Sequence, residues 1–159
     1  MRYLLILFTL CLSQASANSL TTIGWIEPVR IMPEGFNLEA KIDTGADNSS
    51  VDVREWESYF HNDEEWIRFK VPNNAGDFQT FERPLERYAL IKRKKAESVR
   101  RPVVKMWLCI GSQRIQTSVN LSKRKDFKYR MLIGRSFLKG RYLVDSAAKR
   151  TQSSKCDLI

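Results

Sequence analysis

The chain has 159 residues, of which 43% are hydrophobic and 28% are charged. This length and composition indicate one globular domain and exclude a disordered or fibrous protein. Lysine and arginine outnumber aspartate and glutamate by 27 to 18, which gives a formal net charge of +9. The single histidine, His61, excludes a site built from clustered histidines, and no glycine-rich phosphate-binding motif supports a nucleotide site.

Residues 1–17 have the pattern of an export signal peptide. Arg2 precedes an apolar run from Tyr3 to Leu12, and Ala15-Ser16-Ala17 offers a cleavage site. The apolar run is about half of the ~20 residues that a membrane-spanning helix needs. We therefore expect a cleaved leader and a periplasmic or secreted protein, with an uncleaved anchor as the weaker alternative.

Two cysteines, Cys109 and Cys156, remain after the leader is removed. An oxidising compartment permits a disulfide between them. The alternative is a buried free Cys109 in a strand and a loose tail that carries Cys156, and the sequence leaves both open. Residues 146–159 are polar, and we expect them to form a frayed C-terminal tail.

The apolar pattern is that of short strands and not of helices. Runs rich in β-branched and aromatic residues alternate with proline, glycine, asparagine or aspartate, which is typical of strands joined by turns. The predicted strands are Ile23–Met32, Phe36–Ile42, Trp66–Val71, Arg87–Lys92, Pro102–Ile110 and Gln113–Val119. Ser136–Lys139, between Gly134 and Gly140, is the predicted helical turn. Short strands with few helices predict an all-β, closed or nearly closed barrel.

Basic residues gather at Arg83–Lys105 and Lys123–Arg130. Aromatic residues at stacking spacing are not interleaved with these runs, so the sequence predicts no nucleic-acid partner. We expect most of this charge to lie on a solvated face. A secondary expectation is attraction toward anionic envelope polymers or acidic substrates.

The motif that carries chemistry is Asp43-Thr44-Gly45-Ala46, which follows the strand-like run Leu38–Ile42. An acid at the end of a strand, followed by a hydroxyl residue and glycine, forms a tight turn that presents one carboxylate. The same triplet is also simply a good turn, and it arises by chance in ~3% of chains of this length. The surrounding strands and a second motif, Met131–Arg135, favour the chemical interpretation.

These motifs resemble those of the retropepsin-like aspartic proteases. A bacterial branch, commonly labelled ATP-dependent zinc proteases, is similar over roughly residues 23–145. The segments that carry the resemblance are Gly24–Glu27, Ala40–Asp47, Arg101–Val104, Met131–Arg135 and Gly140–Asp145. The resemblance implies a retropepsin-like closed barrel over residues 22–145 with one short helix near the C-terminus. Because His61 stands alone and no ATP-binding loop occurs, we expect neither a metal nor a cofactor.

The resemblance implies an aspartic endopeptidase with Asp43, Thr44 and Gly45 as its catalytic residues. One carboxylate must act as base toward water while a second protonates the scissile carbonyl. The chain carries one such motif, so the second Asp43 must come from another copy across a two-fold axis. Thr44 would then bond across this axis, and Gly45 would admit the substrate backbone.

The resemblance also implies supporting and substrate-binding residues. Ala46, Asp47 and Trp66 are expected to bind substrate, and Asp47 is expected to pair with Arg135 as structural support. A plain surface ion pair is the alternative for that pair, and a core position is the alternative for Trp66. The hairpin Trp66–Phe81, which turns at Pro72–Asp77, is the expected flap over the substrate.

The predicted partners are a peptide or protein substrate and a second copy of the chain, with an association with the envelope as a further expectation. Two other functions stay open. The first is a catalytically silent envelope module that keeps the barrel and binds peptides or cell-wall polymer. The second is a metal-dependent hydrolase that uses His61 with aspartate or glutamate.

Overall fold

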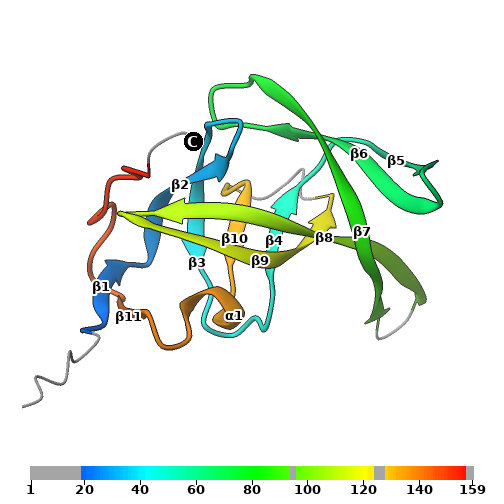
Figure 1. Ribbon diagram of the computed structural model, residues 1–159. Coiled ribbons are helices and arrows are strands. Elements are labelled where there is room, and N and C mark those ends of the chain that lie inside the picture. Colours follow the sequence, from blue (N-terminus) through cyan, green and yellow to red (C-terminus); the bar gives the residue numbers. More distant parts are fainter. Residues whose placement is uncertain (1–18, 94–95, 124–127, 157–159) are drawn as a thin grey trace, which may run out of the picture.

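The structure, a computed structural model, describes residues 19–93, 96–123 and 128–156 (Figure 1). Within these ranges the chain is built of strands and one short helix, so the predicted all-β class is confirmed. The elements are β1 (Thr21–Gly24), β2 (Ile26–Met32), β3 (Phe36–Ile42), β4 (Ser49–Asp52), β5 (Trp56–His61), β6 (Glu64–Pro72), β7 (Phe78–Arg93), β8 (Ala96–Ile110), β9 (Gln113–Ser122), β10 (Met131–Ile133), α1 (Arg135–Leu138) and β11 (Tyr142–Asp145).

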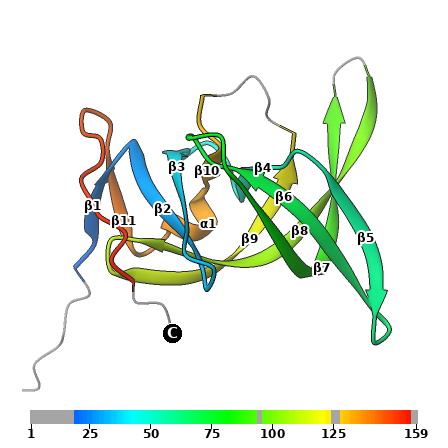
Figure 2. The same ribbon diagram turned by 90° about the horizontal axis from the view of Figure 1, so that it is seen from above.

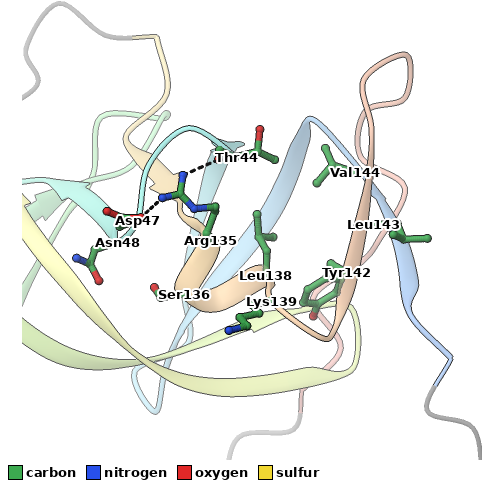
Figure 3. A pocket seen from close by; sticks show the side chains of 10 residues that line it. All are labelled: Thr44, Asp47, Asn48, Arg135, Ser136, Leu138, Lys139, Tyr142, Leu143 and Val144. Carbon is green, nitrogen blue, oxygen red and sulfur yellow. Dashed lines mark hydrogen bonds and ion pairs between the residues drawn. The ribbon is translucent and has the colours of Figure 1, made fainter.

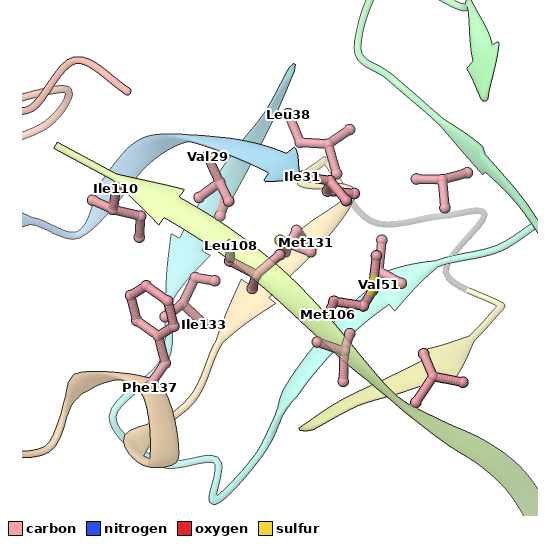
Figure 4. Close-up of a cluster of buried hydrophobic side chains, with 14 of the residues drawn as sticks. Val29, Ile31, Leu38, Val51, Met106, Leu108, Ile110, Met131, Ile133 and Phe137 are labelled. Carbon is pink, nitrogen blue, oxygen red and sulfur yellow. The ribbon is translucent and has the colours of Figure 1, made fainter. Parts of the chain in front are cut away.

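Six strands close a barrel in the order β2-β3-β10-β4-β9-β8, and β8 pairs again with β2. Closure pairs the strand edges, which would otherwise leave backbone groups open. The apolar residues that alternate along the strands form the core, because every second residue of a strand points into the barrel. The predicted closed barrel is confirmed. Figure 4 shows the interior side chains, among them Val29, Ile31, Leu38, Val51, Met106, Leu108, Ile110, Met131, Ile133 and Phe137.

Strands β7, β6 and β5 continue the sheet outside the barrel. In β6 the buried residues Ile67, Phe69 and Val71 alternate with exposed ones, and Phe69 stacks on Phe81 with ring centroids 5.6 Å apart. This packing ties the outer sheet to the main core.

The outer parts of β7 and β8 form a two-stranded arm, residues 87–93 and 96–101. Strand β6 pairs with β7 only as far as Pro84, and β9 pairs with β8 only from Val103. Among the described strands, the arm therefore has no third neighbour, and a register shift between Leu85 and Arg87 marks where it leaves the barrel. Figure 2 shows this hairpin extending away from the barrel.

The predicted strand Ile23–Met32 is interrupted at Trp25. Its first part, β1, pairs in parallel with β11, whereas β2 enters the barrel. The Trp25 N–H donates to the carbonyl of Ala148 and its carbonyl accepts from Ile42, so the two halves follow different partners. Among the described residues, no helix is both long and apolar enough to span a membrane. The predicted leader, residues 1–17, lies outside the described residues.

Residues 146–156 form a strap that packs on the barrel, and the expectation that they fray is wrong. The Arg150 N–H donates to the Ile26 carbonyl at 2.7 Å, and that of Lys155 donates to Gly111 at 2.8 Å. Cys156 forms a disulfide with Cys109. Of the two alternatives for the cysteines, the structure therefore contains the bridge. Residues 157–159 lie outside the described residues.

The strap is held by the fully buried carboxylate of Glu27. Its Oε1 accepts from the N–H groups of Gly24 and Thr151 and from the Thr151 hydroxyl, and Oε2 accepts from the N–H of Gln152. Four donors compensate the cost of burying this charge. A Cβ on Gly24 would lie 2.5 Å from the Ala148 carbonyl oxygen, so glycine is needed there for the strap to approach. The Gly24–Glu27 motif is thus a strap-binding element.

We predict that Glu27→Gln lowers the free energy of unfolding by about 2–3 kcal/mol, because an amide N–H₂ would face the N–H of Gln152 or Thr151. Urea unfolding of the full chain measures the change. Glu39→Gln is the matched control: this half-exposed carboxylate also contacts the strap, through Arg150, and we expect its loss to cost less than ~1 kcal/mol. Equal effects of the two substitutions would show that Glu27 does not anchor the strap.

Candidate active site

The Asp43 loop, residues 43–48, connects β3 to β4 at the end of the barrel where α1 lies (Figure 1). The Asp43 N–H donates to the carbonyl of Ile133 at 2.8 Å, and the Gly45 N–H donates to Asp43 Oδ1 at 3.1 Å. Asp43 is half-buried, whereas Thr44 and Gly45 are exposed. The turn therefore fixes one carboxylate at the surface, next to two residues that no part of the described chain covers.

The loop is bonded along its length to the corner between β10 and α1. The N–H of Arg135 donates to the Ala46 carbonyl, and that of Ser136 donates to the Asp47 carbonyl, both at 2.9 Å. The Gly134 N–H donates to the buried hydroxyl of Ser49 at 3.2 Å. These bonds satisfy the backbone groups at the start of α1, which has no side-chain cap.

Gly134 is required for this contact. A Cβ at that position would lie 2.6 Å from the carbonyl carbon of Asn48 and 3.0 Å from the carbonyl oxygen of Ala46. Both obstructing groups are backbone, so neither can rotate away. The glycine of the Met131–Arg135 motif therefore serves a close approach of two chain segments, because any side chain would push the Asp43 loop off β10.

Arg135 braces the loop from the outside. Its Nη1 donates to the Thr44 carbonyl at 2.9 Å, and its Nη2 is paired with Asp47 Oδ1 (Figure 3). The expected Asp47–Arg135 contact is present. The two side chains are 79% and 51% exposed, so the ion pair alone stabilises little. The contact mainly fixes the shape of the loop, since one guanidinium joins both ends of the Thr44–Asp47 turn.

A cavity of about 740 Å³ lies beside the Asp43 loop, and Figure 3 shows Leu138 and Val144 between the loop and β11. One side of the cavity is polar and comes from the loop and α1, and the other is apolar and comes from α1 and β11. Leu143, on this apolar side, is 53% exposed. The lining residues are Thr44, Asp47, Asn48, Arg135, Ser136, Leu138, Lys139, Tyr142, Leu143 and Val144.

Tyr142 is a structural wall of this cavity. Its hydroxyl donates to the carbonyl of Ile110 at 3.0 Å, and its ring stacks on Phe137 with centroids 5.7 Å apart. Burial raises the pKa of Tyr142 to about 12. The phenol therefore stays neutral at any pH near neutrality, and its hydrogen bond to Ile110 gives it a structural role.

The structure brings Asp43, Thr44, Gly45, Ala46, Asp47 and Arg135 together but does not bring Trp66 to them. Trp66 lies in β6 of the outer sheet, where its indole N–H donates to Glu64 at 3.1 Å and its ring meets the edge of His61. It is half-buried, so it is not a core residue either. Within one subunit, Trp66 is therefore separate from the cavity beside Asp43.

The expected flap is also in a different place. The hairpin Trp66–Phe81 exists, but it is bonded to Arg54 and Glu55, which follow β4, whereas the Asp43 loop precedes β4. Asn74, in its turn, donates to the carbonyl of Lys128 at 3.4 Å. The assignment of this hairpin as a flap over its own Asp43 loop is wrong, because the hairpin is bonded to the segment that follows β4, at the end of β4 opposite to the loop.

His61 lies at the exposed turn between β5 and β6, beside Asn62 and Trp66. In the described part of the chain, no three side chains of histidine, cysteine, aspartate or glutamate are grouped so that they could hold a metal ion. The alternative of a metal-dependent hydrolase built on His61 gains no support from this position.

Similarity to known proteins agrees with the geometry of the loop. The family model described as "Retropepsin-like aspartic endopeptidase RimB" matches residues 22–155. A crystal structure of a protein of unknown function from Legionella pneumophila subsp. pneumophila strain Philadelphia 1 is similar, with a TM-score of 0.73 and 28% identity. The similarity covers 85% of this chain and 100% of that one.

Two curated relatives each bear the name "Probable alpha-L-glutamate ligase". The one from Desulfotalea psychrophila is 28% identical over 113 residues, which are 69% of this chain and 24% of the relative. The one from Shewanella pealeana is 26% identical over 124 residues, which are 76% of this chain and 27% of that relative. The chain thus spans about a quarter of the length of these relatives. The match over residues 22–155 shows that the chain belongs to the RimB-like family of retropepsin-like aspartic endopeptidases.

Proposed function

We propose that the chain hydrolyses peptide bonds as a homodimer, with a water molecule activated between the Asp43 carboxylates of two copies. The observation that carries this proposal is the Asp43 loop, which fixes a half-buried carboxylate beside the exposed residues Thr44 and Gly45. A rigid carboxylate at an uncovered surface is what a shared two-chain site needs.

A second copy is required by the chemistry. Base toward water and acid toward the carbonyl are opposite roles, and one carboxylate cannot perform both in one step. The other acid of the loop, Asp47, is paired with Arg135 and is 79% exposed. It therefore supports the loop and leaves the second role to a partner's Asp43.

The apolar side of the cavity supports the same arrangement. Leu143 is 53% exposed on β11, and Leu20, beside the start of β1 with which β11 pairs, is 44% exposed. Exposed apolar side chains on and beside two paired strands are a feature of interaction surfaces. We assign this face, with Thr44 at its edge, to contact with the second copy.

The arm is the better candidate for a flap over the substrate. Among the described strands it is a two-stranded ribbon without a third strand, and the hydroxyl of Tyr88 near its base donates to Glu65 of β6 at 2.7 Å. A projecting hairpin of this kind suits a lid that must open and close. The sequence indicated this hairpin, because only nine residues separate the predicted strands Arg87–Lys92 and Pro102–Ile110. Strand β8 in fact extends into that interval as far as Ala96.

We further propose that the substrate is an acidic peptide. The formal charge, +9 for the full chain and +8 once Arg2 is removed with the leader, attracts anionic chains over about one Debye length. The matching segments of the two relatives belong to proteins named glutamate ligases, and a hydrolase domain joined to such an enzyme would meet glutamate-containing peptides. Export to the periplasm stays part of the proposal, supported by the leader pattern and by the disulfide.

We predict that Asp43→Asn abolishes hydrolysis, because an amide of nearly the same shape can neither hold the shared proton nor act as base. Digestion of a peptide library by the full chain measures activity, with sedimentation as a test of assembly. Asp63→Asn, a matched change in the exposed turn after β5, should stay within about twofold of wild type. An Asp43→Asn variant that binds peptides, beside a wild type that binds but never cleaves, would favour the silent binding module.

Dilution tests the two-copy site. Below the dissociation constant of the dimer, the rate should fall with about the square of protein concentration, since a single chain holds half a site. Leu143→Arg should shift this transition to higher concentration, whereas Phe60→Arg, a matched change at a residue 75% exposed on the outer sheet, should not. A rate that stays linear where sedimentation shows only monomer excludes the shared site.

A further inference from the structure

A second pocket, of about 310 Å³, lies at the base of the arm. It forms where β4, β8 and β9 end their pairing: Ser122 is the register partner of Asp52, and its carbonyl accepts from the N–H of Val53 at 3.0 Å. We call it the basic pocket. Its lining residues are Trp56, Val99, Arg100, Arg101, Leu121, Ser122 and Lys123.

The basic pocket carries positive charge. Arg100, Arg101 and Lys123 line it, and of the described residues that line it none bears a carboxylate. The Arg100 guanidinium lies 4.2 Å from the centroid of the Tyr88 ring, a cation–π contact. A guanidinium and a lysine in one pocket suit a carboxylate, which accepts two parallel hydrogen bonds from the guanidinium.

Two described acids close to the lining residues of the pocket have cationic partners. Asp52 is fully buried and is paired with Arg130 at 3.0 Å and Arg54 at 3.6 Å. Glu55 is paired with Lys70, whose hydrogen bond lowers the pKa of that carboxyl below its usual value. Each of these carboxylates therefore has a cationic partner that does not line the basic pocket.

Two further groups complete the pocket. The Ser122 side chain is buried, and its Oγ has no hydrogen-bond partner among the described residues. Buried hydroxyls normally have a hydrogen-bond partner, so this hydroxyl is a donor and acceptor that a bound ligand would satisfy. Trp56 is 37% exposed and contributes an aromatic surface to the lining. The combination fits a side chain with a short methylene stem and a carboxylate head, which is the chemistry of glutamate.

We infer that the basic pocket is a remote subsite that binds an acidic side chain of the peptide substrate. This inference rests on the proposed hydrolase function and adds to it the place where the acid is recognised. Strand β4, of four residues, separates the Asp43 loop from the pocket, which corresponds to ~13 Å at ~3.3 Å per residue. An extended peptide covers that distance in about four residues, so the recognised acid lies four or more residues from the scissile bond.

Two peptides that differ only in carrying glutamate or glutamine four to six residues from the cleaved bond test the subsite. Lys123→Gln in the full chain should raise KM for the glutamate peptide about 5–10-fold, with kcat within about twofold and the glutamine peptide unaffected. Arg114→Gln is the control: it removes the same charge at the other end of β9, where Arg114 stacks on Trp107. Equal effects of Arg114→Gln and Lys123→Gln, or equal KM values of wild type for the two peptides, would overturn the inference.

A binding measurement separates this inference from the hydrolase proposal. Fluorescence anisotropy of the labelled peptides with the Asp43→Asn variant reports binding without cleavage. Tighter binding of the glutamate peptide that is lost with Arg100→Gln or Lys123→Gln supports the subsite even if wild type cleaves nothing. Cleavage by wild type together with equal binding of the two peptides would refute the subsite and leave the hydrolase standing.

Discussion

The site depends on one close backbone contact, between the Asp43 loop and the corner where β10 meets α1. Two backbone hydrogen bonds at 2.9 Å and the approach of Gly134 to Asn48 fix the loop before any substrate is present. Arg135 then joins the two ends of the turn. A catalytic carboxylate must be held within a fraction of an ångström of its working position, and the barrel supports the loop that carries Asp43 in the way that its proposed role needs.

A second constraint binds the termini of the domain to the same barrel. The buried carboxylate of Glu27 gathers the backbone of β1 and of the strap, and the Cys109–Cys156 disulfide closes the strap at its far end. β1 in turn pairs with β11, which lines the cavity beside the Asp43 loop. The strap does not line the cavity, but through β1 and β11 it positions the face that we assign to contact with the second copy.

The barrel strands β2, β3, β8 and β9 and the Asp43 loop could be predicted because alternation and the two motifs are local in sequence. Strand β4 was not predicted, because all four of its residues are buried and show no alternation. The pairing of Asp47 with Arg135 came from resemblance, since no local pattern joins residues so far apart. Three features could not be predicted from the sequence: the hydrogen bonds of Glu27 to the polar tail, the basic pocket, and the position of the outer hairpin. Each depends on which strands become neighbours, and a polar segment such as residues 146–156 shows no periodicity that would reveal its partner.

The central claim is that Asp43 residues from two copies form one site, and mixing two proteins tests it most directly. Wild type is incubated with an equal amount of the Asp43→Asn variant until the chains have exchanged, and the rate per wild-type chain is measured. If the site is shared, half of the wild-type chains pair with an inactive partner, so the rate per wild-type chain should fall to about half. An unchanged rate, with exchange confirmed by a tagged chain, would show that each copy carries a complete site and would contradict the shared dyad.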